Sequence, residues 1–169
     1  MGGKTALAWR GVRQNIAFRE HLNLWGDVPR RLPNWFTQRF AAGYQSTQLF
    51  DDGLPVGLGL QPLPGGDARV LVSVPERAML ELLSDVGKLQ SLVEARDLVE
   101  SLPGLRTKVL DELLQHTDRI KVVRMAASMA TRMNLPWAAV AEKHSERIGG
   151  GARWVAVGRT GERLDLKRP

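Results

Sequence analysis

Residues 121–157 read KVVRMAASMATRMNLPWAAVAEKHSERIGGGARWVAV, and this stretch decides the fold class. Its basic, methionine-rich beginning has the apolar spacing of an amphipathic helix, and Pro136 begins a shorter one. Gly149-Gly-Gly151 ends that helix, because three glycines in a row do not support helical structure. Trp154–Val157 and Arg163–Leu166 then alternate as two strands of a β-hairpin. The C-terminal third therefore predicts two helices followed by a hairpin.

Three more helices are predicted immediately before this stretch. Ser73-Val-Pro-Glu76 and Ser91-Leu-Val-Glu94 have capping-box spacing. In such a box the serine accepts a bond from the amide three residues on, and the glutamate reaches back. Thr107–His116 forms the next helix, and Thr117 is predicted to cap the methionine-rich helix, which ends at Asn134. Five helices are thus expected between residues 74 and 145.

The first 75 residues predict mainly β-structure. A short helix is expected at Lys4–Gly11, and the predicted strands are His21–Trp25, Gln45–Phe50, Leu54–Leu63 and Ala68–Val74. Short turns separate most of these strands, which favours an antiparallel or mixed sheet. Strands first, helices second and a returning hairpin predict an α+β domain in which the hairpin rejoins the sheet.

Size and composition indicate one domain in an intracellular protein. The chain has 169 residues, a mass of 18.7 kDa and no cysteine. That length suits a single core, and disulfide or thiolate chemistry is excluded. The sequence offers no apolar run of the ~20 residues that span a bilayer, and its beginning lacks the apolar core of a signal peptide. We therefore expect one domain over residues 1–169, located in the cytoplasm and without membrane partners.

The charge is unevenly distributed along the chain. Residues 1–40 hold seven Lys or Arg against two acids, residues 41–104 four against nine, and residues 105–169 thirteen against seven. The three net charges are +5, −5 and +6, which add up to the total of +6. A polarised surface of this kind suits a polyanion or an acidic protein, whereas scattered solvated charges are the alternative interpretation.

The sequence contains no recognisable catalytic constellation. His21, His116 and His144 fall on three different elements and lack the paired spacing of metal ligands. We find neither a nucleophile elbow nor a phosphate-binding loop. The sequence therefore predicts no enzymatic activity, no cofactor and no metal site.

The predicted methionine-rich helix carries the clearest binding candidate. At 100° per residue, one face combines the residues Lys121, Arg124, Ser128, Thr131 and Arg132. No acid of that helix shares this face, so its cations are expected to be exposed and able to contact phosphates or an acidic partner. Arg153 would extend the patch beyond the glycines. A solvated outer face is the alternative.

Arginines also accompany aromatic residues near the N-terminus. Arg30 and Arg31 precede Leu32-Pro33-Asn34-Trp35-Phe36. Aromatic side chains among arginines can stack on nucleic-acid bases, although tryptophans more often belong to the core. A tryptophan–phenylalanine pair next to Pro33 in a loop is costly to expose unless a partner covers it. Arg30 and Arg31 are therefore further candidates for partner or nucleic-acid binding.

An ordered set of short motifs links the chain to a known family. They are KTALAWRG at 4–11, LPNW at 32–35, VPERAMLELL at 74–83, KVVR at 121–124, Trp137 and GGGAR at 149–153. In this order the chain resembles the C-terminal domain of the AbiEi abortive-infection antitoxins. These proteins are bacterial transcriptional autoregulators of type IV toxin–antitoxin systems.

The resemblance implies a regulatory function rather than a catalytic one. It implies a domain that counters a nucleotidyltransferase-like toxin and assists DNA binding through a basic surface. The winged helix-turn-helix with which such antitoxins usually begin has no counterpart here, since only Met-Gly-Gly precedes Lys4. A stand-alone nucleic-acid-binding module that acts through its charge is the alternative from another class.

Overall fold

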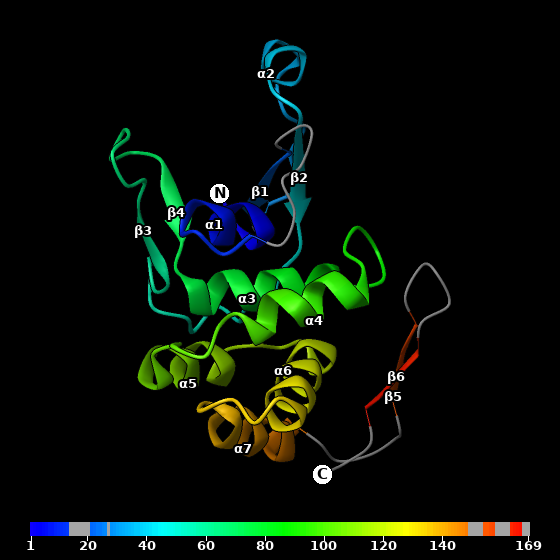
Figure 1. The fold of residues 1–169 in the computed structure, drawn as a ribbon. Coiled ribbons are helices and arrows are strands. Elements are labelled where there is room, and N and C mark those ends of the chain that lie inside the picture. Colours follow the sequence, from blue (N-terminus) through cyan, green and yellow to red (C-terminus); the bar gives the residue numbers. More distant parts are fainter. Residues whose placement is uncertain (14–20, 27, 149–153, 158–162, 167–169) are drawn as a thin grey trace.

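The computed structural model describes residues 1–13, 21–26, 28–148, 154–157 and 163–166, and within them the α+β class is confirmed. Figure 1 shows the arrangement. The elements in chain order are α1 (Gly3–Trp9), β1 (Leu22–Gly26), α2 (Asn34–Arg39), β2 (Ala42–Ser46), β3 (Leu60–Pro62), β4 (Leu71–Ser73), α3 (Pro75–Asp85), α4 (Leu92–Glu100), α5 (Thr107–Gln115), α6 (Ile120–Arg132), α7 (Ala138–Ile148), β5 (Trp154–Val157) and β6 (Arg163–Leu166). The five expected helices of the middle and C-terminal part are α3 to α7.

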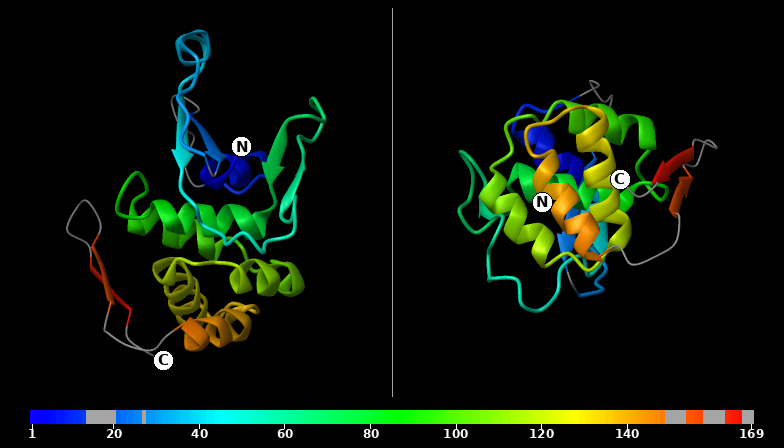
Figure 2. Two further views of the ribbon diagram at one scale, coloured as in Figure 1. Left: turned by 180° about the vertical axis from the view of Figure 1, so that it is seen from behind. Right: turned by 90° about the horizontal axis from the view of Figure 1, so that it is seen from below.

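Helix α3 lies at the centre of the fold. It packs against α1 and β4 on one side and against α4, α5 and α6 on the other. Helices α5, α6 and α7 form a layer beneath it, with α7 packed on both α5 and α6 (Figure 1). Strands β1, β2 and β3 and helix α2 lie on the α1 side (Figure 1). Viewed from behind, β1, α2 and β2 form one projection and the β3–β4 hairpin a second (Figure 2).

The hydrophobic core lies between these helices. Leu82 and Leu83 of α3, Leu113 of α5 and Met125 of α6 are almost completely buried. Trp137, just before α7, is fully buried, and its indole nitrogen donates to the Leu102 carbonyl oxygen at 2.8 Å. Apolar side chains at i, i+3 and i+4 meet on one side of a helix, and these helices bury that side.

The strands do not form the single sheet that was predicted. The described strands make three separate two-stranded sheets: β1 with β2, β3 with β4, and β5 with β6. The pair β1–β2 is parallel, and residues 28–41, which include α2, lie between the two strands in the chain instead of a short turn. The hairpin Trp154–Val157 with Arg163–Leu166 forms as predicted, but it lies beside α6 and does not rejoin another sheet.

The predicted strand Gln45–Phe50 is also displaced. Strand β2 begins at Ala42 and ends at Ser46, so only its last two residues overlap the prediction. Beyond it, the chain pairs with the segment before α6: the Asp51 amide donates to the His116 carbonyl at 2.8 Å, and the Asp118 amide to the Leu49 carbonyl at 3.2 Å. This pairing buries Leu49 and Phe50 without a regular strand.

Of the three predicted caps, only Ser91 acts as one. Its hydroxyl accepts from the Glu94 amide at 3.1 Å, although the Glu94 carboxylate bonds to Lys4 and Gln90 and does not reach back. Val74 precedes α3, whose first residue Pro75 has no amide hydrogen to cap. The Thr117 hydroxyl donates to the Leu113 carbonyl of α5 at 2.7 Å, and α6 begins three residues after Thr117, so Thr117 does not cap α6.

A buried carboxylate joins α1, β4 and α3. Glu81 is almost fully buried, and its oxygens accept from the Gly3 amide at 2.8 Å, the Ser73 hydroxyl at 2.9 and 3.0 Å, and Arg77 Nε at 3.0 Å. Arg77 also donates to the Leu58 carbonyl at 3.0 Å, and its guanidinium lies 4.9 Å from the centre of the Phe50 ring. Ser73 is therefore used in this cluster, not as a helix cap.

Candidate partner-binding surface

The polar face of α6 is less exposed than the sequence predicted. Arg132 and Thr131 at its C-terminal end are exposed, whereas Lys121, Arg124 and Ser128 are half-buried. The opposite face is buried as expected. Lys121 and Arg124 are therefore partly covered by neighbouring elements, whereas Arg132 is exposed to solvent.

Lys121 shows why. Its ammonium donates to the carbonyl oxygen of Val86, the residue that follows α3, at a helix end where backbone carbonyls lack intrahelical partners. Burial lowers the pKa of Lys121, and the cations Lys88 and Arg119 lower it further while Asp85 raises it. The expectation that Lys121 is exposed was wrong, because a helix C-terminus attracts the cation.

An acid from another helix reaches the same face. The Thr131 hydroxyl donates to the Glu142 carboxylate of α7 and to the Ala127 carbonyl at 2.9 Å. As predicted, no acid of α6 itself lies on its polar face. In the folded protein, however, Glu142 of α7 reaches that face. Arg153, the predicted extension of this patch, lies outside the described residues.

The segment around α2 presents a different surface. We call residues 28–41, which include α2, the α2 projection. The helix has no buried residue, and Trp35 is 65% exposed, Val28 57% and Phe40 39%. Trp35 stands edge-on to Phe36 at 5.6 Å between ring centres, and Phe36 lies 4.9 Å from Phe40. Trp35 is thus not a core residue, which was the commoner interpretation of the tryptophans, whereas Phe36 is half-buried between its neighbours. Both residues lie on helix α2 and not in the expected loop.

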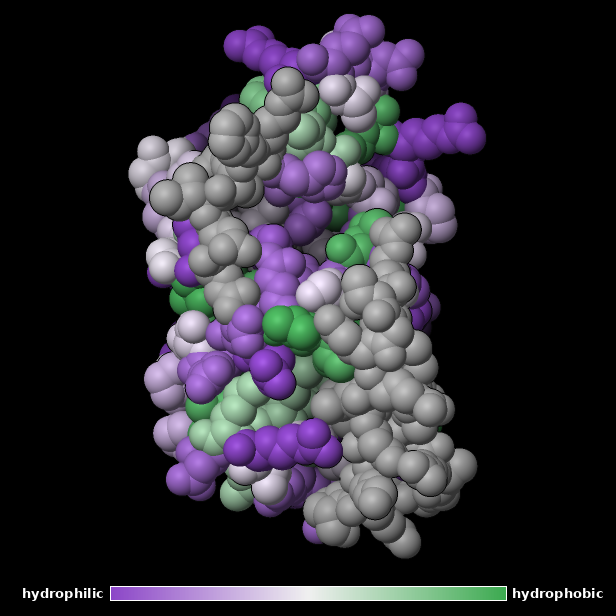
Figure 3. Space-filling model, turned by 45° about the vertical axis from the view of Figure 1, so that its right-hand side comes forward, coloured by the Kyte–Doolittle hydropathy of each residue, from purple (hydrophilic) through white to green (hydrophobic). Residues whose placement is uncertain are grey.

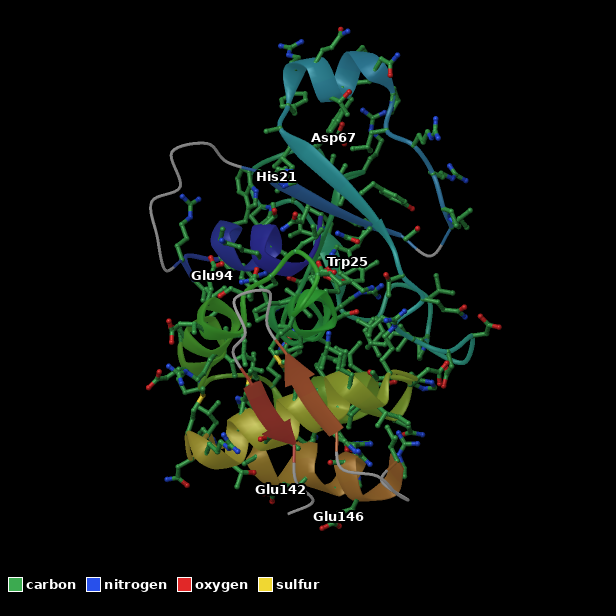
Figure 4. The ribbon with its side chains drawn as sticks, turned by 90° about the vertical axis from the view of Figure 1, so that its right-hand side faces the viewer. His21, Trp25, Asp67, Glu94, Glu142 and Glu146 are labelled. Atoms are coloured by element: carbon green, nitrogen blue, oxygen red, sulfur yellow. The ribbon has the colours of Figure 1, made fainter. Side chains whose placement is uncertain are left out.

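Arginines surround these aromatic rings. Arg30, Arg31 and Arg39 are exposed, and the Arg39 guanidinium lies 5.8 Å from the Phe40 ring centre. Nitrogen-tipped side chains extend outward from α2 and from the segment leading into it (Figure 4), and hydrophilic and hydrophobic side chains alternate at that end of the molecule (Figure 3). Residues 28–50 contain three arginines and no lysine or acid, a formal charge of +3. The sequence analysis did not select Arg39 and Phe40 as candidate binding residues, although the absence of acids from residues 28–50 could have indicated them.

A close contact fixes the base of the α2 projection. The Tyr44 hydroxyl of β2 donates to the Val28 carbonyl at 2.8 Å. A β-carbon at Gly26 would lie 2.2 Å from that hydroxyl oxygen, so only glycine permits the approach. The α2 projection is therefore fixed at its base, where it meets β1 and β2.

Two of the three histidines contact separate acids, whereas His21 Nδ1 lies 3.2 Å from the Asn23 side-chain oxygen. His116 Nδ1 lies 2.8 Å from an Asp51 oxygen, and His144 Nε2 lies 2.6 Å from an Asp111 oxygen. These bonds are the largest cause of a lowered pKa at Asp51 and at Asp111. Within the described residues, no group of three or more His, Cys, Asp or Glu could hold a metal ion. Over the same residues, no helix is long and apolar enough to cross a membrane.

Comparison with known protein families matches residues 19–167 to a family of transcriptional regulators, described as AbiEi antitoxin of a Type IV TA (toxin–antitoxin) system. The match extends over most of the chain. The protein belongs to the AbiEi antitoxin family. Comparisons with curated proteins and with solved structures gave no match.

The AbiEi match includes both candidate surfaces, the α2 projection and the polar face of α6. Helix α1 precedes the matched range, yet Ala6 and Leu7 are fully buried and the Gly3 amide bonds to Glu81 of α3. Residues outside the AbiEi match therefore contribute to the core.

Proposed function

We propose that this AbiEi-family chain counters a nucleotidyltransferase-like toxin and assists DNA binding through a basic surface, without enzymatic activity or a cofactor. The family match over residues 19–167 carries the proposal. The chain would act in the cytoplasm as one domain. Lys121, Arg124, Ser128, Arg132, Arg153, Arg30 and Arg31 remain the candidate contact residues.

Among the candidate positions in the described residues, Arg30, Arg31 and Arg132 are exposed. Arg30 and Arg31 are exposed beside the aromatic rings of the α2 projection. Lys121 is the weakest candidate, because its ammonium already bonds to the Val86 carbonyl. A basic surface used for binding would therefore be centred on the α2 projection.

Co-expression in growing cells tests the antitoxin proposal. The chain is expressed with the nucleotidyltransferase-like product of its neighbouring gene, and growth is compared with that of cells carrying the toxin alone. We expect growth to be restored. The Leu113→Asp variant, in which a charge enters a fully buried position, is the control and should fail to protect.

Failure to protect against such a toxin would refute the antitoxin proposal. If the wild-type chain then still binds duplex DNA with a strong salt dependence, the alternative of a stand-alone nucleic-acid-binding module holds. The unevenly distributed charge of the sequence favours that second candidate.

A further inference from the structure

The α2 projection exposes apolar and cationic groups together, in a segment that contributes nothing to the core. Trp35, Val28 and Phe40 are exposed beside Arg30, Arg31 and Arg39. We propose that the α2 projection is a contact element for double-stranded DNA, in which the three arginines bind phosphates and Trp35 contacts the bases. This inference rests on the proposed DNA-assisting function and names the surface responsible.

Charge is the first argument for DNA. Many cations elsewhere in the described residues are paired with acids: Arg69 with Asp67, Arg77 with Glu81, Arg106 with Glu76, Lys4 with Glu94 and Lys143 with Asp111. The α2 projection contains no acid at all. A polyanion gains from such a surface, because no carboxylate of residues 28–41 repels the neighbouring phosphates.

Shape is the second argument. Helix α2 has six residues, so it is about 9 Å long, and a helix with its side chains is about 10–12 Å across. The major groove of B-DNA is about 12 Å wide. The arginines lie on both sides of the helix in sequence, Arg30 and Arg31 before it and Arg39 at its end. They can therefore meet phosphates while Trp35 faces a base edge or a thymine methyl group.

The base of the projection is the third argument. Tyr44 and Gly26 hold Val28 in place through the hydrogen bond and the close approach described above. A contact element that is fixed before binding loses less conformational entropy when DNA binds. An unanchored loop carrying the same arginines would lose more.

The test is the salt dependence of duplex binding by the full chain. Affinity for a random-sequence duplex of about 20 base pairs is measured by fluorescence anisotropy from about 50 to about 200 mM salt. We expect the triple variant Arg30→Gln, Arg31→Gln, Arg39→Gln to lower the slope of log K against log salt by about 2.7, since each phosphate contact contributes about 0.9. A matched control removes three exposed cations far from α2 (Arg96→Gln, Lys108→Gln and Lys143→Gln) and should leave the slope nearly unchanged.

Trp35 provides an independent readout. Trp35→Ala should weaken binding about 10- to 150-fold, the range for losing the burial of a large apolar side chain, here against a base edge or a thymine methyl group, without changing the salt slope. Circular dichroism confirms that each variant is folded, which we expect because α2 has no buried residue. A purely electrostatic surface would leave the affinity of Trp35→Ala unchanged and would contradict the base contact.

The outcomes separate this inference from the proposed function. If the triple variant keeps the wild-type salt slope, or the wild-type chain binds no duplex at low salt, the DNA assignment is overturned. Loss of toxin protection in that variant with unchanged DNA binding would instead show that the projection contacts a protein. If the wild-type chain restores no growth but the triple variant loses the predicted slope, the antitoxin proposal fails while this inference stands.

Discussion

Replacing Glu81 with Gln tests the buried cluster that joins α1 to α3. The substitution keeps the size of the side chain but turns one acceptor oxygen into a donor. Both carboxylate oxygens already accept bonds, Oε2 from the Gly3 amide and Oε1 from Arg77, and Ser73 donates to either. The new NH₂ group must therefore face another donor.

The expected loss can be worked out from these bonds. One buried donor without a partner costs about 1–3 kcal/mol, and breaking a buried ion pair costs about 3–5 kcal/mol. Arg77 keeps its bond to the Leu58 carbonyl and its contact with Phe50, so the lower part of the second range applies. We expect Glu81→Gln to reduce the free energy of unfolding by about 2–4 kcal/mol, which lowers the urea midpoint by about 1–2 M for a chain of this size.

Urea unfolding followed by circular dichroism at about pH 8 measures this loss. Burial raises the pKa of Glu81, against the lowering effect of Arg77 and the other donors. Glu100→Gln on the exposed side of α4 is the matched control and should change stability by less than about 0.5 kcal/mol. Equal midpoints for wild type and Glu81→Gln would refute the reasoning, because they would show that the carboxyl group is already neutral in the folded protein.

Three further predictions concern the core, pH and the α2 projection. Leu82→Ala and Leu113→Ala should each lower the free energy of unfolding by about 2–5 kcal/mol, and an unchanged melting curve for both would contradict the assigned helix faces. Burial raises the pKa of Asp85 to about 6 from 3.8, so its contribution to stability is fully present below about pH 3.8 and is lost as the pH rises through about 6. Asp85→Asn should abolish that part of the pH dependence of the free energy of unfolding, on the order of 1 kcal/mol after solvent screening. The measurement is the urea midpoint between about pH 5 and pH 7.5, and a variant profile that matches wild type would disprove the raised pKa of Asp85. Gly26→Ala should lower the free energy of unfolding, measured with urea, by about 1–3 kcal/mol, because the new methyl group would displace the Tyr44 hydroxyl. The loss should be smaller in a Tyr44→Phe background, which lacks that hydroxyl, and equal losses in both backgrounds would count against this contact.

The helical part of the fold could be predicted from the sequence because its signals are local. Apolar residues three and four positions apart marked the buried faces of α3 to α6, and Asn134, with φ at 51°, ended the methionine-rich helix as expected. The β5–β6 hairpin was predicted with its observed bounds, since alternation and glycines define it within a few residues.

The other features of the fold depend on contacts between residues that are distant in the sequence. Ser73 looks like a cap by spacing, but its hydroxyl bonds to Glu81 in the folded protein. Lys121 looks exposed on a helical wheel, but the end of α3 lies beside it. The parallel pairing of β1 with β2 could not be read from alternation, which is the same for parallel and antiparallel edges. The α2 projection was recognised only through Arg30, Arg31 and Trp35.

Site-specific photocrosslinking tests the central claim, that α2 contacts DNA, most directly. Asn34, the first residue of α2, is exposed and has no assigned role, so Asn34→benzoylphenylalanine places a photoreactive group at the contact without removing an arginine or Trp35. Lys108→benzoylphenylalanine on α5 is the control. Irradiation with a labelled duplex should give a protein–DNA adduct for position 34 and none for position 108. Equal DNA adducts at both positions, or none at position 34, would contradict the account.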